Sequence, residues 1–334
     1  MYRSAESTAT LTQMDAPNGT LRLRGDSPMS ELRCNGYAVV HGAIPPDRAA
    51  RYVNEIYRWL ESVGKGFKAD DRDTWHVQCM PRFQKGGLYK RYGVAHEQFA
   101  WDIRTEPAVI DAFAQIWGTD ELLVSFDAIN ASFPFPSDEL GQAAKPWPHV
   151  DQSPTRSSMH CIQGIINLLE NGPDDGGLMV LEGSMSLFAE FFRAHPQLRP
   201  EEGWPEIDWY SHSDDTLQWF YERGCKWKKI EAGPGDLILW DSRMIHYGDA
   251  AKGDRPRVAT YVCYKPAKTI TSEKLEAKKE CFRERWGTSH DPLNFRISRP
   301  NAGDYTLEPK ESVYPRRGPT LSERALKLAG IVEY

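Results

Sequence analysis

Residues 233–240 read Gly-Pro-Gly-Asp-Leu-Ile-Leu-Trp, a turn followed at once by a short apolar run. Gly and Pro are strong breakers of regular structure, so the four apolar residues after them predict a strand that begins at a turn. The same pattern of short apolar runs bounded by turn residues recurs from about residue 120 onward. The other strand-like runs are 122–130, 161–169, 178–181, 227–230 and 257–264. Many short strands separated by turn residues are typical of an antiparallel sandwich or barrel.

Helical patterns flank this β region. A short strand at 36–40 precedes a helix at 45–60, where Pro suits the first turn and the apolar residues recur at helical spacing. Further helices are expected at 107–117, 186–194 and 321–329. We therefore expect a mainly β fold with flanking helices.

The domain boundaries follow from the same patterns. A flexible leader is expected at 1–30, because it is polar and has no periodicity. A single domain with N-terminal helices is expected at 31–290. An irregular C-terminal tail, either packed on the domain or extending from it, is expected at 291–334, which is rich in Pro.

Composition and charge exclude several classes of function. The 334 residues carry 41 basic and 47 acidic side chains, whereas a nucleic-acid-binding protein gathers Lys and Arg on one face. No stretch approaches the roughly 18 uninterrupted apolar residues of a membrane span, and no secretory signal is visible. Six scattered Cys residues form no Cys-x-x-Cys pair. We expect a soluble, cytoplasmic protein that binds neither nucleic acid nor membrane, and a homodimer is left open.

The strongest chemical signal is His149-Val150-Asp151. Residues two apart on an extended segment point to the same side, so this imidazole and carboxylate can hold one ion. His246, after the strand at 237–240, is the natural third ligand. Two His and one carboxylate on one face of a metal leave positions open, which suits Fe(II) that takes up a co-substrate and O2. The alternative is an ordinary hydrogen-bonded His–Asp pair.

Arg257 strengthens the metal interpretation. It begins the strand-like run 257–264, and a hairpin from His246 would return it beside the metal, about one dicarboxylate length away. Its guanidinium is permanently charged and forms two-point contacts with carboxylates. The alternative is a surface charge that happens to begin a strand.

Four stretches together resemble the Fe(II)/2-oxoglutarate dioxygenases of the phytanoyl-CoA dioxygenase type, over about 35–265. They are Pro-His-Val-Asp-Gln at 148–152, Gly-Gly-Leu-Met-Val-Leu-Glu-Gly-Ser at 176–184, Trp-Asp-Ser-Arg-Met-Ile-His at 240–246, and Arg257. The resemblance implies a double-stranded β-helix (a jelly-roll, cupin-like core) with helices outside it. It also implies that His149, Asp151 and His246 bind Fe(II) and that Arg257 holds the far carboxylate of 2-oxoglutarate.

The chain departs from the family pattern at three positions. The family usually reads Pro-Gly-Ser-His after the Gly-rich strand, but Glu182 and Met185 replace the Pro and the His. Relatives often carry a hydroxyl residue two positions after the distal His, where this chain has Gly248. Asn130 and Tyr261 are candidates for the co-substrate contacts that these changes put in doubt.

Other side chains are candidates for the substrate pocket, namely Trp147, Phe133, Trp240 and His76. Aromatic residues beside a jelly-roll are as often plain core as pocket lining. Arg156 and Arg243 could meet an anionic substrate, although Arg243 could equally pair with Asp241.

The resemblance implies an enzyme that oxidises a C–H bond of a small organic molecule. The outcome would be hydroxylation or desaturation, with natural-product metabolism as a setting, coupled to decarboxylation of 2-oxoglutarate to succinate. The alternatives are a metal-dependent cupin-type isomerase or lyase and a non-catalytic jelly-roll binding protein. Arg257 favours the oxygenase over the isomerase, which needs no dicarboxylate clamp, and the complete triad disfavours a non-catalytic role.

Overall fold

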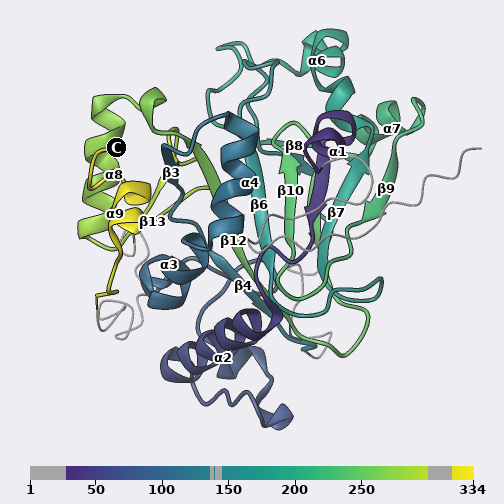
Figure 1. Ribbon diagram of the computed structural model, residues 1–334. Helices are drawn as coiled ribbons and strands as arrows, with labels where there is room; N and C mark the ends of the chain where they lie inside the picture. The colour runs from purple at the N-terminus through teal and green to yellow at the C-terminus, as the bar shows by residue number, and fades with distance from the viewer. Residues whose placement is uncertain (1–27, 136–138, 140–144, 300–317) are drawn as a thin grey trace, which may run out of the picture.

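Two antiparallel sheets face each other and helices lie outside them (Figure 1). The computed structural model describes residues 28–135, 139, 145–299 and 318–334. Nearly all of the leader expected at 1–30 lies outside the described residues.

The larger sheet has the strand order β1-β10-β6-β12-β4-β2, and β3 pairs with β12 beside this path. Its strands are β1 (Tyr37–Val40), β2 (Leu88–Tyr89), β3 (Leu122–Val124), β4 (Ile129–Ser132), β6 (Ile162–Asn167), β10 (Leu237–Asp241) and β12 (Arg257–Pro266). The smaller sheet has the order β8-β5-β11-β7-β9. Its strands are β5 (His149–Val150), β7 (Gly177–Glu182), β8 (Tyr210–Ser211), β9 (Lys226–Lys229) and β11 (His246–Asp249).

The chain passes repeatedly between these two sheets. From β4 to β12 the chain crosses between the sheets six times: β4, β6, β10 and β12 belong to the larger sheet, and β5, the run β7 to β9, and β11 belong to the smaller one. A fold made of two facing antiparallel sheets connected in this way is a jelly-roll. The expected fold class is confirmed.

Helices cover the outer face of the larger sheet and both ends of the molecule (Figure 1). They are α1 (Pro28–Asn35), α2 (Pro46–Val63), α3 (Gln98–Arg104), α4 (Pro107–Trp117), α6 (Ser184–Ala194), α7 (Asp214–Tyr221), α8 (Ser272–Arg283) and α9 (Glu323–Ala329). The main core joins Leu60 of α2 and Phe113 of α4 to Leu239 and Val262 of the sheet. The four helices expected from periodicity are confirmed as α2, α4, α6 and α9.

The strand expected at 122–130 is two strands, β3 and β4, which is a correction to the sequence interpretation. The backbone between them turns to a different partner: Phe126 N donates to the Thr288 hydroxyl, and Thr288 N donates to Phe126 O. Thr288 lies in the hairpin of β13 (Gly287–Thr288) and β14 (Ile297–Ser298). The expected domain boundary at residue 290 falls inside this hairpin, and α9 of the expected tail packs into the main core.

The turn before β10 depends on Gly235. Its φ is +89°, and a Cβ at this position would lie 1.9 Å from the carbonyl oxygen of Ile44. Gly235 N donates to Asn167 O, and Ile44 N donates to Gly235 O. A residue without a side chain is therefore required where the turn meets two neighbouring segments.

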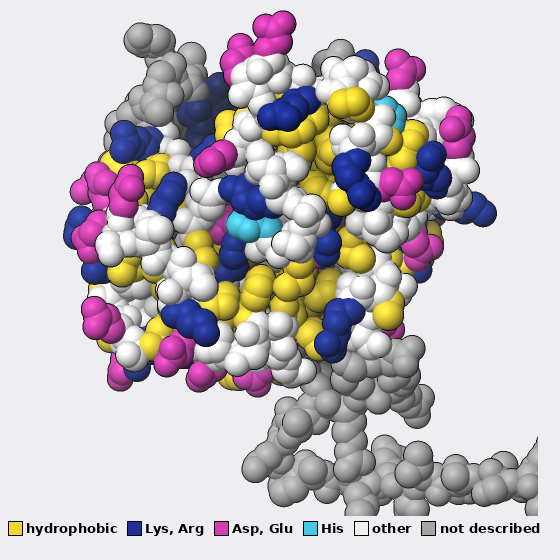
Figure 2. All heavy atoms as spheres, turned by 90° about the horizontal axis from the view of Figure 1, so that it is seen from above, with side chains coloured by type: hydrophobic (Ala, Val, Ile, Leu, Met, Phe, Trp, Pro, Cys, Tyr) yellow, Lys and Arg dark blue, Asp and Glu magenta, His cyan; other side chains and the backbone are white. Residues whose placement is uncertain are grey.

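The surface seen from above carries mixed charges (Figure 2). Lys and Arg side chains lie among apolar side chains in the middle of this face, and Asp and Glu lie mostly towards its edge. None of the helices in the described ranges is long and apolar enough to cross a membrane.

Candidate metal centre

Two strands of the smaller sheet bring two imidazoles together. His149 on β5 and His246 on β11 are directly paired residues, so their side chains share one face of the sheet. Their ring centroids lie 4.3 Å apart. Only 3% of His149 and 5% of His246 is exposed, so both rings are removed from bulk water.

Asp151 completes the cluster from the turn after β5. Its backbone N–H donates to Ser242 O, which fixes the turn against the segment between β10 and β11. The Asp151 Oδ2 atom lies 3.7 Å from Nε2 of His149 and 3.4 Å from Nε2 of His246. One ligand atom from each of the three residues lies within 4.8 Å of the others, so a single ion can touch all three.

The backbone sets which ring nitrogen faces this point. Nδ1 of His149 lies 3.0 Å from Trp147 O, and Nδ1 of His246 lies 2.9 Å from Met244 O. A carbonyl oxygen can only accept, so each Nδ1 carries the proton and each Nε2 keeps its lone pair. Metal-binding imidazoles are held by this kind of hydrogen bond, which fixes the tautomer and the ring orientation.

The protonation states also suit a cation. Burial alone would raise the pKa of Asp151, but the nearby imidazoles of His290, His149 and His246 hold it well below its usual value. The amide of Gln163 donates to Asp151 Oδ2 at 2.9 Å. Burial, together with His246, lowers the pKa of His149. The site therefore presents an ionised carboxylate and a neutral imidazole, which are the forms that bind metal.

The three residues line a cavity of about 330 Å³ between the two sheets. The other wall is one face of the larger sheet, where the strand register places Asn130, Ile165 and Tyr261 beside Arg257. This volume lies within the range of small-molecule sites. The cavity therefore has room for a co-substrate beside the metal position.

Arg257 is a buried cation without a counter-charge. It is 8% exposed, and in the described part of the chain its guanidinium has neither a hydrogen-bond nor an ion-pair partner. Burial and the charge of Arg257 lower the pKa of Lys229 to about 8, so a second basic group lies near this guanidinium. Burying an unpaired charge is costly, and an anionic ligand would remove that cost.

The structure brings most of the expected pocket residues to this cavity. Asn130 and Tyr261, expected at the co-substrate, line it, as do the aromatic candidates Trp147, Phe133 and Trp240. The indole of Trp147 stacks on the His149 ring with the centroids 4.1 Å apart.

Three candidates lie elsewhere. His76 is not part of the cavity wall, and its Nδ1 lies 2.6 Å from Glu139. Arg243 pairs with Asp241 at 2.8 Å and Arg156 pairs with Asp208 at 2.8 Å, and neither guanidinium lines the cavity.

Several lining residues were not expected from the sequence. Gln163 could have been expected, because strand alternation puts it on the same face as Ile165 and opposite Trp240. His290 and Arg296 could not have been expected, because they come from the β13–β14 hairpin, which carries no recognisable motif. Trp209 likewise lies in a segment that gave no signal.

Comparison with known proteins identifies a family whose chemistry agrees with a metal site at His149, Asp151 and His246. Residues 32–259 match the phytanoyl-CoA dioxygenase (PhyH) family. "Ava biosynthesis cluster protein O" of Aspergillus versicolor is 40% identical over 264 residues, which cover 78% of this chain and 84% of that protein. "Putative phytanoyl-CoA dioxygenase" of Dictyostelium discoideum is 23% identical and covers 79% of this chain and 82% of its own.

A solved structure shares the fold. The protein GIG2 of Candida albicans superposes with a TM-score of 0.59 at 13% identity, over 92% of this chain and 76% of that one. At this level of identity the likeness concerns the arrangement of the strands and helices alone.

Proposed function

The chain belongs to the phytanoyl-CoA dioxygenase (PhyH) family of Fe(II)- and 2-oxoglutarate-dependent enzymes, and from this premise we propose that it oxidises a C–H bond of a small organic molecule. The outcome proposed is hydroxylation or desaturation, coupled to conversion of 2-oxoglutarate to succinate. The relative from Aspergillus versicolor is named for a biosynthesis cluster, which supports a role in natural-product metabolism.

His149, Asp151 and His246 would hold the iron. The observation that carries this assignment is that two Nε2 lone pairs and one ionised carboxylate face a common point, with both Nδ1 protons engaged by carbonyls. When bound, iron with 2-oxoglutarate supplies activation of O2 for oxidation of the substrate. Three protein ligands leave positions open for both.

Arg257 would bind the distal carboxylate of 2-oxoglutarate. It lies on β12, within the same cavity as the triad, and it lacks any other counter-charge among the described residues. A two-point contact between a guanidinium and a carboxylate fixes orientation as well as position. The co-substrate would therefore be aligned before O2 arrives.

Asn130 and Tyr261 would complete the co-substrate contacts. The Ser132 hydroxyl donates to Asn130 Oδ1 at 2.8 Å, which leaves the amide N–H groups of Asn130 to donate to a ligand. Tyr261 lies two residues along β12 beyond Ala259, on the same face as Arg257. These two side chains would replace the hydroxyl that Gly248 cannot supply.

Aromatic walls would keep the reacting centre dry. The rings of Trp147, Trp240 and Phe133 line the cavity and offer apolar surface to a substrate. Excluding water limits side reactions and strengthens the polar contacts inside the site.

Release of succinate from 2-oxoglutarate tests the proposal. Purified protein supplied with 2-oxoglutarate, Fe(II) and O2 should form succinate. Some members of a panel of candidate metabolites should raise the rate of succinate formation. His246→Ala should lose this activity, because one of the three ligands is gone, whereas His195→Ala, which removes a ring near Phe191 outside the cavity, should retain it. Equal succinate formation by wild type and His246→Ala would overturn the assignment.

A further inference from the structure

The cavity is completed by a segment that the family match does not reach. The match ends at residue 259, and the β13–β14 hairpin, at 287–298, supplies Ser289, His290 and Arg296 to the cavity wall. Ser289 N donates to Arg296 O, and Arg296 N donates to the Ser289 hydroxyl. The family's shared core therefore leaves one wall to be built by this chain's own C-terminal region.

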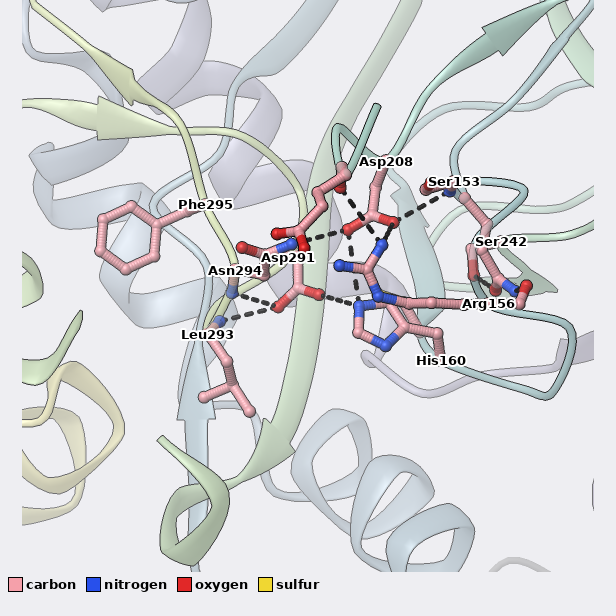
Figure 3. A network of polar contacts seen from close by, with 12 residues as sticks. Ser153, Arg156, His160, Asp208, Ser242, Asp291, Leu293, Asn294 and Phe295 are labelled. Carbon is pink, nitrogen blue, oxygen red and sulfur yellow. Dashed lines mark hydrogen bonds and ion pairs between the residues drawn. The ribbon is translucent and has the colours of Figure 1, made fainter. Parts of the chain in front are cut away.

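A buried network of charges holds this wall in place (Figure 3). Asp291, next to His290, is 1% exposed, and its Oδ1 accepts from the backbone N–H groups of Leu293 and Asn294. Its Oδ2 lies 2.9 Å from Nζ of Lys265 and 3.0 Å from Nε2 of His160. The hairpin is thus tied to β12 and to the segment before β6.

The same network reaches a second part of the wall. Asp208 precedes Trp209, which lines the cavity, and it accepts from Arg156 at 2.8 Å and from the Asn294 amide at 3.0 Å. Asp208 also accepts from the backbone N–H of Ser153 at 3.0 Å, and Nε2 of His160 lies 3.5 Å from its Oδ2 (Figure 3). Arg156 and Lys265 neutralise the carboxylates of Asp208 and Asp291. The cluster therefore holds the cavity segments together and does not serve as a cation site.

The charges that line the cavity do not balance. Among the described residues, four basic side chains line it (Lys85, Lys90, Arg257, Arg296) against three acidic ones (Asp127, Asp151, Asp249). Fe(II) and the dianion 2-oxoglutarate cancel each other, so the loaded cavity keeps an excess of one positive charge. That excess matches a monoanion such as a carboxylate better than a neutral ligand or a doubly charged phosphate ester.

In the described ranges none of these four cations forms an ion pair, and Arg257 is taken by the proposed co-substrate. Lys85 and Arg296 line the cavity as exposed side chains, so a ligand can reach both from solvent. Nζ of Lys85 lies 4.2 Å from the centre of the Trp147 ring, whose other side stacks on His149. Lys85 therefore sits across one indole from a metal ligand, at the tip of a turn where its φ is +47°.

We propose that the substrate carries a carboxylate on an aromatic or apolar body, and that Arg296 and Lys85 bind this carboxylate. The aromatic walls at Trp147, Trp209 and Phe135 would take the body of the molecule. This assignment rests on the proposed function, because it takes the metal position as the place of reaction. Arg296 and Lys85 thereby set specificity, whereas Arg257 is kept for the co-substrate.

Matched ligand pairs test the proposal without knowledge of the natural substrate. Protein saturated with Fe(II) and 2-oxoglutarate, in the absence of O2, is titrated calorimetrically with 3-phenylpropionate and 3-phenylpropanamide. Pairs with naphthyl and indolyl rings and with different chain lengths follow. The best carboxylate should bind about tenfold more tightly than its amide, the size expected for a charge-assisted contact.

The variants separate this contact from the rest of the site. Arg296→Gln and Lys85→Gln should each lower the preference for the carboxylate severalfold and leave 2-oxoglutarate affinity unchanged. Arg299→Gln is the matched control, since this neighbouring guanidinium lies over Trp286 and outside the cavity wall. Amides that bind as well as carboxylates, no binding by any carboxylate, or an unchanged preference in the Arg296/Lys85 double variant would overturn the proposal. Failure of the wild type to bind Fe(II) and 2-oxoglutarate in the loading step would instead overturn the proposed function.

Discussion

At the scale of single residues, the site depends on hydrogen bonds that the sequence shows only in part. The His-x-Asp spacing predicts two ligands from local geometry, because alternation along an extended segment is a property of any strand. The carbonyls that hold Nδ1 of His149 and His246 both come from the residue two positions earlier, so this part is local too. The contact between Gln163 and Asp151 crosses between strands and needs the sheet register.

The Gln163 contact leads to a prediction about metal affinity. Gln163→Leu keeps the size of the side chain but removes the amide that orients Asp151 Oδ2. Loss of a partner of a metal ligand costs about 10- to 100-fold in affinity. Competition with an Fe(II) chelator should show this loss, whereas Gln218→Leu, on the exposed face of α7, should match wild type. Equal affinity in the two variants would show that the Gln163 amide plays no part in holding the ligand.

Arg257 leads to a prediction about co-substrate selection. Arg257→Gln should weaken 2-oxoglutarate binding about 10- to 100-fold, because a charged hydrogen bond is worth about 1.5–3 kcal/mol. Binding of 2-oxovalerate, which lacks the distal carboxylate, should change little, and iron affinity should be retained.

Titration of both keto acids under anaerobic conditions measures the difference. Arg193→Gln, which removes an exposed guanidinium of α6, serves as the control. If Arg257→Gln weakened both keto acids equally, the guanidinium would not be the clamp for the distal group.

At the scale of elements, periodicity and turn chemistry predicted the strands and helices that have local signals. The helices α2 and α4 begin at Pro and bury one apolar face, which a sequence displays directly. The break between β3 and β4 was not predictable, since Phe126 leaves the sheet edge to bond with Thr288, 162 residues away. The β13–β14 hairpin was missed for the same reason: its strands are two residues long and are defined by distant partners.

The turn at Gly235 can be tested against a glycine of the same kind in open space. Gly42 also has a positive φ, +65°, but nothing lies within 4 Å of a Cβ built there. Gly42→Ala should therefore cost only the backbone strain, about 1–2 kcal/mol. Gly235→Ala should cost clearly more, because the Ile44 carbonyl occupies the space and the segment after β1 must move away from the turn before β10. Urea unfolding measures both, and equal losses would contradict the tight approach at Gly235.

At the scale of the whole molecule, a buried amine makes stability depend on pH. Lys278 on α8 is fully buried and donates to Val124 O, and burial, helped by Arg104, lowers its pKa to about 7. Between pH 7 and the ordinary Lys pKa near 10, the unfolded chain holds a proton that the folded chain has released. The contribution of this group to stability therefore rises with pH across that window and is lost as the pH falls towards 7.

Replacement of the amine should remove this dependence. One proton corresponds to about 1.4 kcal/mol per pH unit. Between pH 7 and 9 the free energy of unfolding of the wild type should therefore rise, relative to that of Lys278→Met, by up to this amount per pH unit. Lys279→Met, at a partly exposed neighbour paired with Glu276, should keep the wild-type slope. Parallel curves for wild type and Lys278→Met in denaturant titrations would show that the amine stays charged in the fold.

The family and the general chemistry were within reach of the sequence, because His149, Asp151, His246 and Arg257 stand in stretches with characteristic order. The wall proposed to bind the substrate was not. It is assembled from 84–90, Trp209 and 287–298, and the cluster of His160, Asp208 and Asp291 that holds it together unites residues up to 131 positions apart. Contacts between residues so far apart give no periodic pattern in the sequence.

The most direct test of the central claim is the visible absorption of the protein mixed with Fe(II) and 2-oxoglutarate in the absence of O2. Chelation of the keto acid by iron at the three-residue site should produce a weak charge-transfer band, which should vanish in His246→Ala. In Arg257→Gln the band should need a much higher 2-oxoglutarate concentration. A wild-type protein without the band, or a band of equal strength in His246→Ala, would contradict the account.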